Sequence, residues 1–199
     1  MSLTEGRMKV GLTFSLVLIA LFVCNEARSQ TLDIVAIGDS NTAGFGVGRA
    51  GAFPAVLEAT LRAEGYNVRV SNQGVSGDTT GGILARLDAA VPQGVRVAIV
   101  QGGFNDKRRG TTPDRITANV DAILAKLRAK RVSVILCGLS GQAWDAIART
   151  RGATLVPSSA CYDANSRGFD GLHMNAAGHR IVAARLSSTI KRLLPRRGR

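Results

Sequence analysis

The sequence predicts one α/β domain, a three-layer α/β/α sandwich around a five-stranded parallel sheet. Short apolar runs alternate with stretches of helical periodicity along the chain. Polar, glycine-rich segments follow three of these runs. Strands that alternate with helices form parallel sheets covered on both faces, so the pattern favours this class over an antiparallel sandwich or a helical bundle.

Five short apolar runs are expected to form the strands. They occupy residues 33–37, 67–70, 95–100, 132–137 and 153–156. Each has the length of an ordinary strand. No internal repeat or low-complexity linker interrupts them, so we expect a single domain over residues 30–199.

Apolar side chains at helical spacing mark the helices between the runs. Three such faces stand out: Phe53, Leu57 and Leu61; Ile116, Val120, Ile123, Leu124 and Leu127; Val182, Leu186, Ile190 and Leu193. Thr112 and Pro113 are expected to cap and open the second helix, and Asn175 to begin the last one.

The first 29 residues are typical of a secretory signal peptide. Arg7 and Lys9 precede an uncharged run over 10–25, and residues 27–29 supply a small-x-small cleavage pattern before Gln30. The apolar centre is shorter than the roughly 20 residues that a membrane span needs. We therefore expect a periplasmic or secreted protein. An uncleaved anchor remains an alternative, and Met1 and Met8 both remain candidate starts.

The formal net charge is +12, and the C-terminal tail is basic. Its cationic residues are Lys191, Arg192, Arg196, Arg197 and Arg199. Such a tail is usually a solvated end, with weak contact to an anionic envelope surface as a second interpretation. Export argues against a nucleic-acid partner, and the oligomeric state stays open.

Two cysteines, Cys137 and Cys161, remain after the expected cleavage. An oxidising compartment permits a disulfide between them. Spacing alone does not show that their Cα atoms come close enough, so the bridge is left open.

Three predicted strands end in polar, glycine-rich segments of the kind that form active sites. The first ends in Gly38-Asp39-Ser40, the second at 72–74 and the third at 102–106. Parallel α/β sheets place their sites at the carboxyl ends of strands, so these segments are expected to meet at one edge.

A serine acts as a nucleophile when a base takes its proton and a third group orients that base. The chain has two histidines, and His173 follows Asp170 by three residues on a loop before the last helix. We interpret Ser40, His173 and Asp170 as nucleophile, base and orienting carboxylate. His179, inside the final helix, is expected to be structural or on the surface.

An oxyanion hole needs donors aimed at the developing charge. Three candidates lie on the strand ends: the backbone N–H of Ser40, the backbone N–H of Gly74 and the side-chain amide of Asn105. Glycine permits close approach of backbone to substrate because it has no Cβ.

Four segments resemble the conserved blocks of the SGNH (GDSL-type) hydrolases, in order. They read GDSNTAGFG, SNQGVSGDTT, QGGFND and DGLHMNAAGH. The resemblance covers about residues 33–194 and is strongest to bacterial arylesterases, thioesterases and lysophospholipases. It implies a flavodoxin-like fold and a serine hydrolase that cleaves carboxylic esters or thioesters of small or acyl substrates. It assigns Ser40, Asp170 and His173 to the triad and Gly74 and Asn105 to the oxyanion hole.

Two features depart from that subgroup. Asn41 follows the nucleophile where an aliphatic residue is usual, and the segment 139–161 is shorter. Since this segment helps to wall the acyl pocket in the lysophospholipase-like members, we expect short acyl chains to be preferred.

The sequence gives little support for a nucleotide-binding or metal-binding site. Residues 46–51 match GxGxxG, but the motif does not directly follow the first strand and the second strand lacks the expected acidic end. No zinc-ligand spacing or phosphate-binding loop is present, so no metal or cofactor is expected. A carbohydrate or peptidoglycan O-deacetylase and a non-catalytic acyl- or glycan-binding protein remain the alternatives.

Overall fold

A computed structural model describes residues 30–194 of the chain. Its sheet has five parallel strands, as predicted, and their order is β2-β1-β3-β4-β5. The strands are β1 (Leu32–Gly38), β2 (Val68–Gly74), β3 (Val97–Val100), β4 (Ser133–Cys137) and β5 (Thr154–Val156). This order is flavodoxin-like, and the chain reverses direction across the sheet between β1 and β3. Ligands of such sheets bind beyond the carboxyl ends of those two strands.

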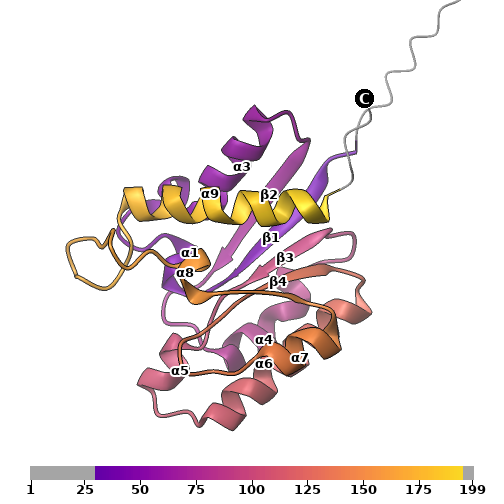
Figure 1. The fold of residues 1–199 in the computed structure, drawn as a ribbon, viewed down its shortest axis with the longest axis vertical. Coiled ribbons are helices and arrows are strands. Elements are labelled where there is room, and N and C mark those ends of the chain that lie inside the picture. The colour runs from indigo at the N-terminus through magenta and orange to yellow at the C-terminus, as the bar shows by residue number, and fades with distance from the viewer. Residues whose placement is uncertain (1–29, 195–199) are drawn as a thin grey trace, which may run out of the picture.

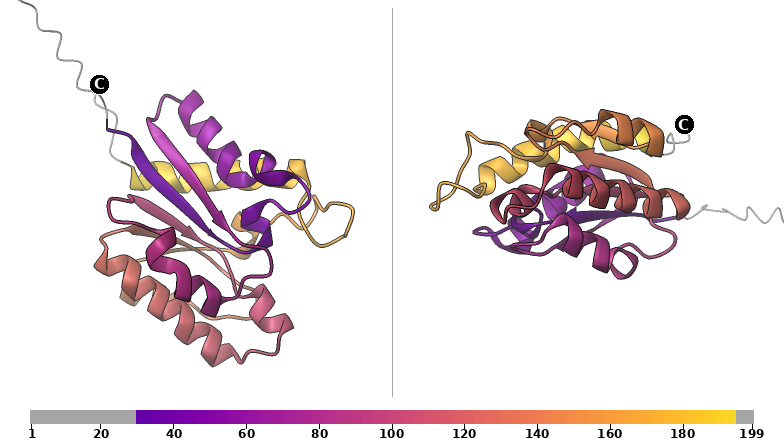
Figure 2. Two further views of the ribbon diagram at one scale, coloured as in Figure 1. Left: turned by 180° about the vertical axis from the view of Figure 1, so that it is seen from behind. Right: turned by 90° about the horizontal axis from the view of Figure 1, so that it is seen from below.

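Helices cover both faces of the sheet (Figure 1). The first four are α1 (Ser40–Ala43), α2 (Gly48–Gly51), α3 (Phe53–Ala63) and α4 (Thr80–Ala90). The remaining five are α5 (Phe104–Arg108), α6 (Pro113–Ala129), α7 (Asp145–Arg151), α8 (Ser158–Cys161) and α9 (Ala176–Leu193). Helices α3 and α9 lie on one face, and α4, α6 and α7 lie on the other (Figures 1 and 2).

Strand β1 divides the core into two apolar clusters. Ile34 and Ala36 pack with α3 and α9, whereas Val35 and Ile37 pack with α4 and α6. A strand buried on both faces reads as a continuous apolar run, which explains why the period-two alternation is missing here. The predicted helical faces are buried, except that Leu193 is only partly covered.

Two predicted helix starts are confirmed by their caps. The Thr112 side chain accepts a hydrogen bond from the Arg115 N–H, and Pro113 is the first residue of α6. The Asn175 side chain accepts from the N–H groups of Ala177 and Gly178 at the start of α9. These bonds satisfy donors that a helix start otherwise leaves free.

Strand β2 extends beyond its apolar run. That run stops at residue 70, and the strand continues to Gly74, at the predicted end segment 72–74, where Gly74 pairs with Gly38 of β1. The added residues are polar or half-buried, and β2 is an edge strand of the sheet. An edge strand tolerates polar side chains, so the apolar run covers only part of β2.

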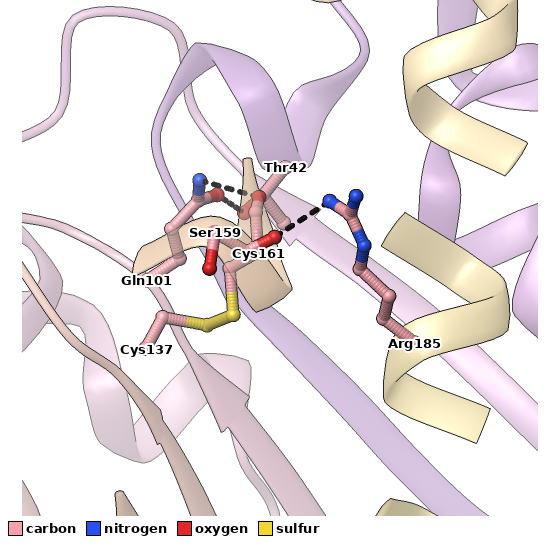
Figure 3. Close-up of a disulfide and its surroundings, with 6 residues drawn as sticks. All are labelled: Thr42, Gln101, Cys137, Ser159, Cys161 and Arg185. Carbon is pink, nitrogen blue, oxygen red and sulfur yellow. Dashed lines mark hydrogen bonds between the residues drawn. A yellow bond between two sulfur atoms is a disulfide. The ribbon is translucent and has the colours of Figure 1, made fainter. Parts of the chain in front are cut away.

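The disulfide that the sequence left open is present. Cys137 at the end of β4 is joined to Cys161 at the end of α8, with a Cα–Cα distance of 5.9 Å (Figure 3). The predicted signal peptide and the last five residues of the basic tail lie outside the described residues. Between residues 30 and 194, no helix is long and apolar enough to cross a membrane.

Candidate active site

Ser40 lies at the point where β1 gives way to α1. Asp39 caps this short helix, because its carboxylate accepts a hydrogen bond from the Asn41 N–H at 3.0 Å. Ser40 is the first helical residue, so its own N–H has no partner within the helix. Gly38 is required before it, since a Cβ there would approach the carbonyl oxygen of Gln101 to 2.7 Å.

The three predicted triad residues come together. His173 Nε2 lies 2.8 Å from Ser40 Oγ, and His173 Nδ1 lies 2.5 Å from Asp170 Oδ2. Asp170 Oδ1 also accepts from the N–H groups of Leu172 and His173, at 3.0 and 2.9 Å. The connected side chains run in one line from carboxylate to hydroxyl.

Hydrogen bonding determines the charge of Asp170. The His173 ring, followed by the backbone N–H groups of His173 and Leu172, lowers the pKa of Asp170 to about 2. The carboxylate is therefore ionised at any neutral or mildly acidic pH. An ionised acceptor holds the proton of His173 on Nδ1, which leaves the Nε2 lone pair facing the Ser40 hydroxyl.

Asp170 and His173 belong to the C-terminal loop, defined here as residues 162–175, which projects beside α1 and α8 (Figures 1 and 2). Local bonds shape this exposed loop. The Gly168 N–H donates to the His173 carbonyl at 2.7 Å, and the Tyr162 hydroxyl donates to the Leu172 carbonyl at 2.6 Å. The Phe45 ring covers His173 with a centroid distance of 4.3 Å.

Asn105 is the second residue of α5, beyond the end of β3. One hydrogen of its amide donates to the Asp78 carbonyl at 2.9 Å. A cavity of about 210 Å³ is lined by Asn105 together with Ser40 and His173. The second amide hydrogen is therefore available to a substrate in this cavity.

The structure does not bring Gly74 to this cavity, so the prediction for that residue was wrong. Its N–H donates to Asn72 Oδ1 at 2.9 Å and is already used. A Cβ at Gly74 would meet the backbone N of Ala43 at 2.1 Å, so glycine is needed here for the close approach of α1.

Gly77 stands where Gly74 was expected. It lines the cavity with Ser40 and has φ +78°, which favours glycine. Within residues 30–194, no oxygen accepts a hydrogen bond from its N–H. Sequence reasoning chose the last residue of β2, whereas Gly77 lies three residues beyond the end of the strand.

Buried bonds tie the strand-end loops together. Asp106 accepts from the Thr80 N–H at 2.8 Å and from the Thr80 hydroxyl at 2.6 Å. Arg86 pairs with Asp78 at 2.8 Å and donates to the Gly38 carbonyl at 3.2 Å. These contacts link the loops after β1, β2 and β3. Sequence reasoning assigned no role to Arg86 or Thr80, because nothing local marks either as part of the site.

A second, larger cavity of about 330 Å³ adjoins the first. The two share Asn41, Phe104 and Leu172 as lining residues. The disulfide Cys137–Cys161 forms part of the larger wall.

Gln101 supports that wall. Its amide donates weakly to the Cys161 carbonyl at 3.4 Å, and its carbonyl accepts from the Thr42 hydroxyl at 2.5 Å (Figure 3). The helix that carries the nucleophile is thereby connected to the disulfide.

Asp39 also lines the larger cavity, and it is 3% exposed. Burial raises the pKa of Asp39 to about 6, and the Asn41 N–H bond only partly opposes this effect. The two carboxyl groups near Ser40 thus have pKa values displaced in opposite directions.

His179 lies away from the contacts between His173 and Ser40. It is fully buried, and its Nδ1 accepts from the Phe53 N–H at 3.1 Å. Burial lowers the pKa of His179 to about 4, so the ring is neutral and joins α9 to α3. In residues 30–194, no cluster of three or more histidine, cysteine or acidic side chains is arranged to hold a metal ion.

The model of the GDSL-like lipase/acylhydrolase family matches residues 36–145. The chain belongs to this family. The matched segment holds Ser40, Gly77 and Asn105 and ends before the C-terminal loop.

Two curated proteins are similar in sequence to about three-fifths of the chain. Esterase TesA of Pseudomonas aeruginosa is 35% identical over 120 residues, 60% of this chain and 59% of that protein. An arylesterase of Vibrio mimicus is 32% identical over 59% of this chain and 60% of its own length. The chain thus spans about three-fifths of the length of these curated relatives in the alignments.

Solved structures extend the similarity to most of the fold. A crystal structure of TesA superposes with a TM-score of 0.72 and 27% identity, covering 81% of this chain and 99% of that one. AlinE4, described as an SGNH-hydrolase family esterase, gives a TM-score of 0.63 and 31% identity, over 84% and 98%. The predicted family and fold class are both confirmed.

Proposed function

We propose that this protein is a carboxylic ester hydrolase that works through an acyl-enzyme on Ser40. The observation that carries the proposal is the continuous contact from Asp170 through His173 to the Ser40 hydroxyl. Such a chain activates a serine whose free hydroxyl would be a weak nucleophile. The esterase and arylesterase relatives support the same reaction class.

In the first half of the reaction, Ser40 Oγ attacks the ester carbonyl while its proton passes to His173 Nε2. The tetrahedral intermediate then expels the alcohol, which takes the proton from His173. In the second half, His173 removes a proton from water, and the resulting hydroxide attacks the acyl carbon. Collapse of this intermediate releases the acid and returns the proton to Ser40 Oγ.

Three donors are proposed for the oxyanion: the N–H of Ser40, the N–H of Gly77 and the free amide hydrogen of Asn105. All three residues line the same cavity, and these hydrogens are not used by other groups of the described chain. Donors held in place by the fold stabilise developing charge without reorganising during the reaction.

The larger cavity is proposed to take the acyl chain. His173 lines the smaller cavity and not the larger one, and it must reach the leaving oxygen. The acyl part is therefore directed past Asn41, Phe104 and Leu172 toward the disulfide. At about 330 Å³, this cavity lies at the lower end of ligand sites, which span roughly 300–1,000 Å³.

Short acyl chains should accordingly react better than long ones. Each further buried methylene contributes about 0.8 kcal/mol only while the cavity has room for it. In a series of p-nitrophenyl esters from acetyl to palmitoyl, kcat/KM should rise and then fall before the longest members. A steady rise to palmitoyl would contradict the restricted cavity.

The test of the reaction uses protein that begins at Gln30. It should hydrolyse p-nitrophenyl acetate and be labelled on Ser40 by a fluorophosphonate, as located by peptide mass spectrometry. Ser40→Ala should lose both properties. Binding of acyl esters without turnover or labelling would instead favour the non-catalytic alternative. Faster release of acetate from acetylated xylan or peptidoglycan than from simple esters would favour the O-deacetylase.

We also propose that the protein is exported with removal of residues 1–29. The disulfide supports this, because such bonds persist in oxidising compartments. N-terminal sequencing of envelope and culture-medium fractions should find a chain that starts at or near Gln30. A chain that still starts at Met1 or Met8 would contradict cleavage.

A further inference from the structure

Three consecutive cationic residues, Lys107, Arg108 and Arg109, follow the oxyanion donor Asn105 by two to four positions. All three are exposed. They continue the segment that carries Asn105 around the mouth of the catalytic cavity, and they differ in how their side chains are used.

Lys107 and Arg109 are engaged with the cavity walls. Lys107 Nζ donates to the Ser140 carbonyl at 2.7 Å, and an Arg109 guanidinium nitrogen donates to the Gly77 carbonyl at 2.8 Å. Ser140 lines the larger cavity and Gly77 the smaller one. These two side chains therefore brace the walls on either side of Arg108.

Arg108 lines the cavity that holds Ser40 and His173. Its guanidinium carbon stands 6.0 Å from the centre of the Phe104 ring, which lines both cavities. Within residues 30–194, the guanidinium makes no ion pair, whereas Arg62, Arg69, Arg86, Arg151 and Arg185 each pair with a carboxylate. No aspartate or glutamate lines the smaller cavity, so Arg108 brings the permanent charge among its lining residues.

The position of Arg108 determines whether its charge faces the leaving group or the acyl part of the ester. The leaving oxygen must come within reach of His173, and His173 and Arg108 line the same cavity. We infer that Arg108 selects esters and thioesters whose leaving group carries an anionic substituent, with phosphate as the shared chemistry. This inference rests on the proposed hydrolase function and specifies its substrate class. A planar guanidinium suits phosphate because it donates two parallel hydrogen bonds.

The test compares substrates whose leaving groups lack or carry phosphate. One pair is octanoylglycerol and octanoylglycerol phosphate, both below their aggregation concentrations. The other pair is octanoyl-pantetheine and octanoyl-coenzyme A. At low salt, the phosphate-bearing member of at least one pair should have a kcat/KM about tenfold higher, which corresponds to about 1.4 kcal/mol. The first pair reports a lipid-type headgroup and the second a nucleotide-type one. The advantage should shrink at high salt, because the charges are partly exposed.

Variants assign the effect to one side chain. Arg108→Gln should bring the ratio of the two kcat/KM values close to one, Arg108→Glu should invert it, and Arg108→Lys should keep most of it. Arg96→Gln is the matched control. Arg96 is exposed and lies just before β3, at the end of the strand opposite to the site. This variant should keep both the wild-type ratio and the wild-type activity.

Two results would overturn the inference. One is a wild-type ratio near one for both pairs at low salt, and the other is a wild-type ratio that survives in Arg108→Gln. In either case, turnover of the neutral esters would leave the proposed function standing. Failure of every ester, together with an unlabelled Ser40, would reject the proposed function itself.

Discussion

The two halves of the site are built in different ways. Ser40 and Asn105 stand at strand ends and are supported by buried groups such as Asp39 and Asp106, which are 3% and 1% exposed. Asp170 and His173 stand on the C-terminal loop, where Asp170 is open to solvent. The first half is held by long-range contacts, and the second is shaped largely by bonds within a dozen residues.

The difference shows in the two carboxyl groups beside Ser40. Burial raises the pKa of Asp39, whereas hydrogen bonds lower the pKa of Asp170. Asp39 belongs to the packed half and caps the nucleophile helix, and Asp170 belongs to the loop and orients the base. Perturbation of the loop should therefore damage chemistry, and perturbation of the strand ends should damage both chemistry and stability.

The largest expected loss of activity follows from removal of a triad residue, either Ser40 or the base His173 on the loop. Ser40→Ala, His173→Ala and the double variant should all lose roughly 10⁴–10⁶-fold in kcat, because triad members act as a unit. Asp170→Ala should lose less, since the imidazole remains but is poorly oriented. Steady-state kinetics with p-nitrophenyl acetate measures these effects.

His179→Ala is the control for that series. Because His179 is buried between α9 and α3, this variant should unfold more easily but keep the kcat of its folded fraction. An inactive His179→Ala beside an active His173→Ala would move the base into α9 and overturn the assignment.

A smaller loss of activity is expected when Asn105 at the strand ends is replaced. Asn105→Ala should lower kcat by roughly 10²–10³-fold with little change in KM, because its amide acts mainly on the transition state. The matched control is Asn119→Ala. Asn119 donates to the Thr80 hydroxyl at 3.0 Å in the same network but does not line the cavity. If both variants lose kcat equally, Asn105 supports the fold and is not an oxyanion donor.

Removal of the disulfide measures how much it stabilises the fold beside the larger cavity. The disulfide closes a separation of 24 residues, for which loop entropy predicts about 3.5 kcal/mol of stability. A Cys137→Ala/Cys161→Ala double variant should lose about that amount in urea unfolding, and reduction of the wild type should have the same effect. Unchanged unfolding after complete reduction would show that packing alone holds α8 against β4.

The pH dependence of stability sharpens the contrast between the two carboxyl groups. For Asp39, a folded-state pKa raised from 3.8 to about 6 gives stability that is fully present below pH 3.8 and is lost as pH rises through 6. Asp39→Asn removes this loss and retains a side chain that can cap α1. Its stability relative to wild type should rise by up to about 3 kcal/mol between pH 4 and pH 7.

For Asp170, the sign is opposite. A pKa lowered to about 2 gives stability that is present above pH 3.8 and is lost as pH falls toward 2. Asp170→Asn should therefore gain nothing between pH 4 and pH 7. Thermal unfolding of both variants against pH measures the contrast, and parallel curves would refute the different environments of the two groups.

The loop half could be predicted from sequence because its bonds are local. Asp170 lies three residues before His173, and Asn175 caps the helix that follows, so a turn with these side chains on one side was expected. Ser40 was also predicted, because the apolar run of β1 ends just before it.

The strand-end half was predicted less completely. The end of β2 at 72–74 was predicted, but Gly74 at that end was chosen in place of Gly77 in the turn beyond it. The bond between Asp106 and Thr80 joins residues 26 positions apart, and no local pattern signals it. The charge of Arg108 was visible in the sequence, but its place on the cavity wall was not.

The sequence by itself predicted the alternation of strands and helices, the proposed nucleophile and the pair of residues proposed to activate it. Periodicity, capping and three-residue spacing are local properties that short segments carry without the rest of the chain. The tertiary structure alone decided which glycine lines the cavity beside Ser40, that Cys137 meets Cys161, and that burial raises the pKa of Asp39. Each of these depends on distances between segments far apart in the chain, and packing sets those distances.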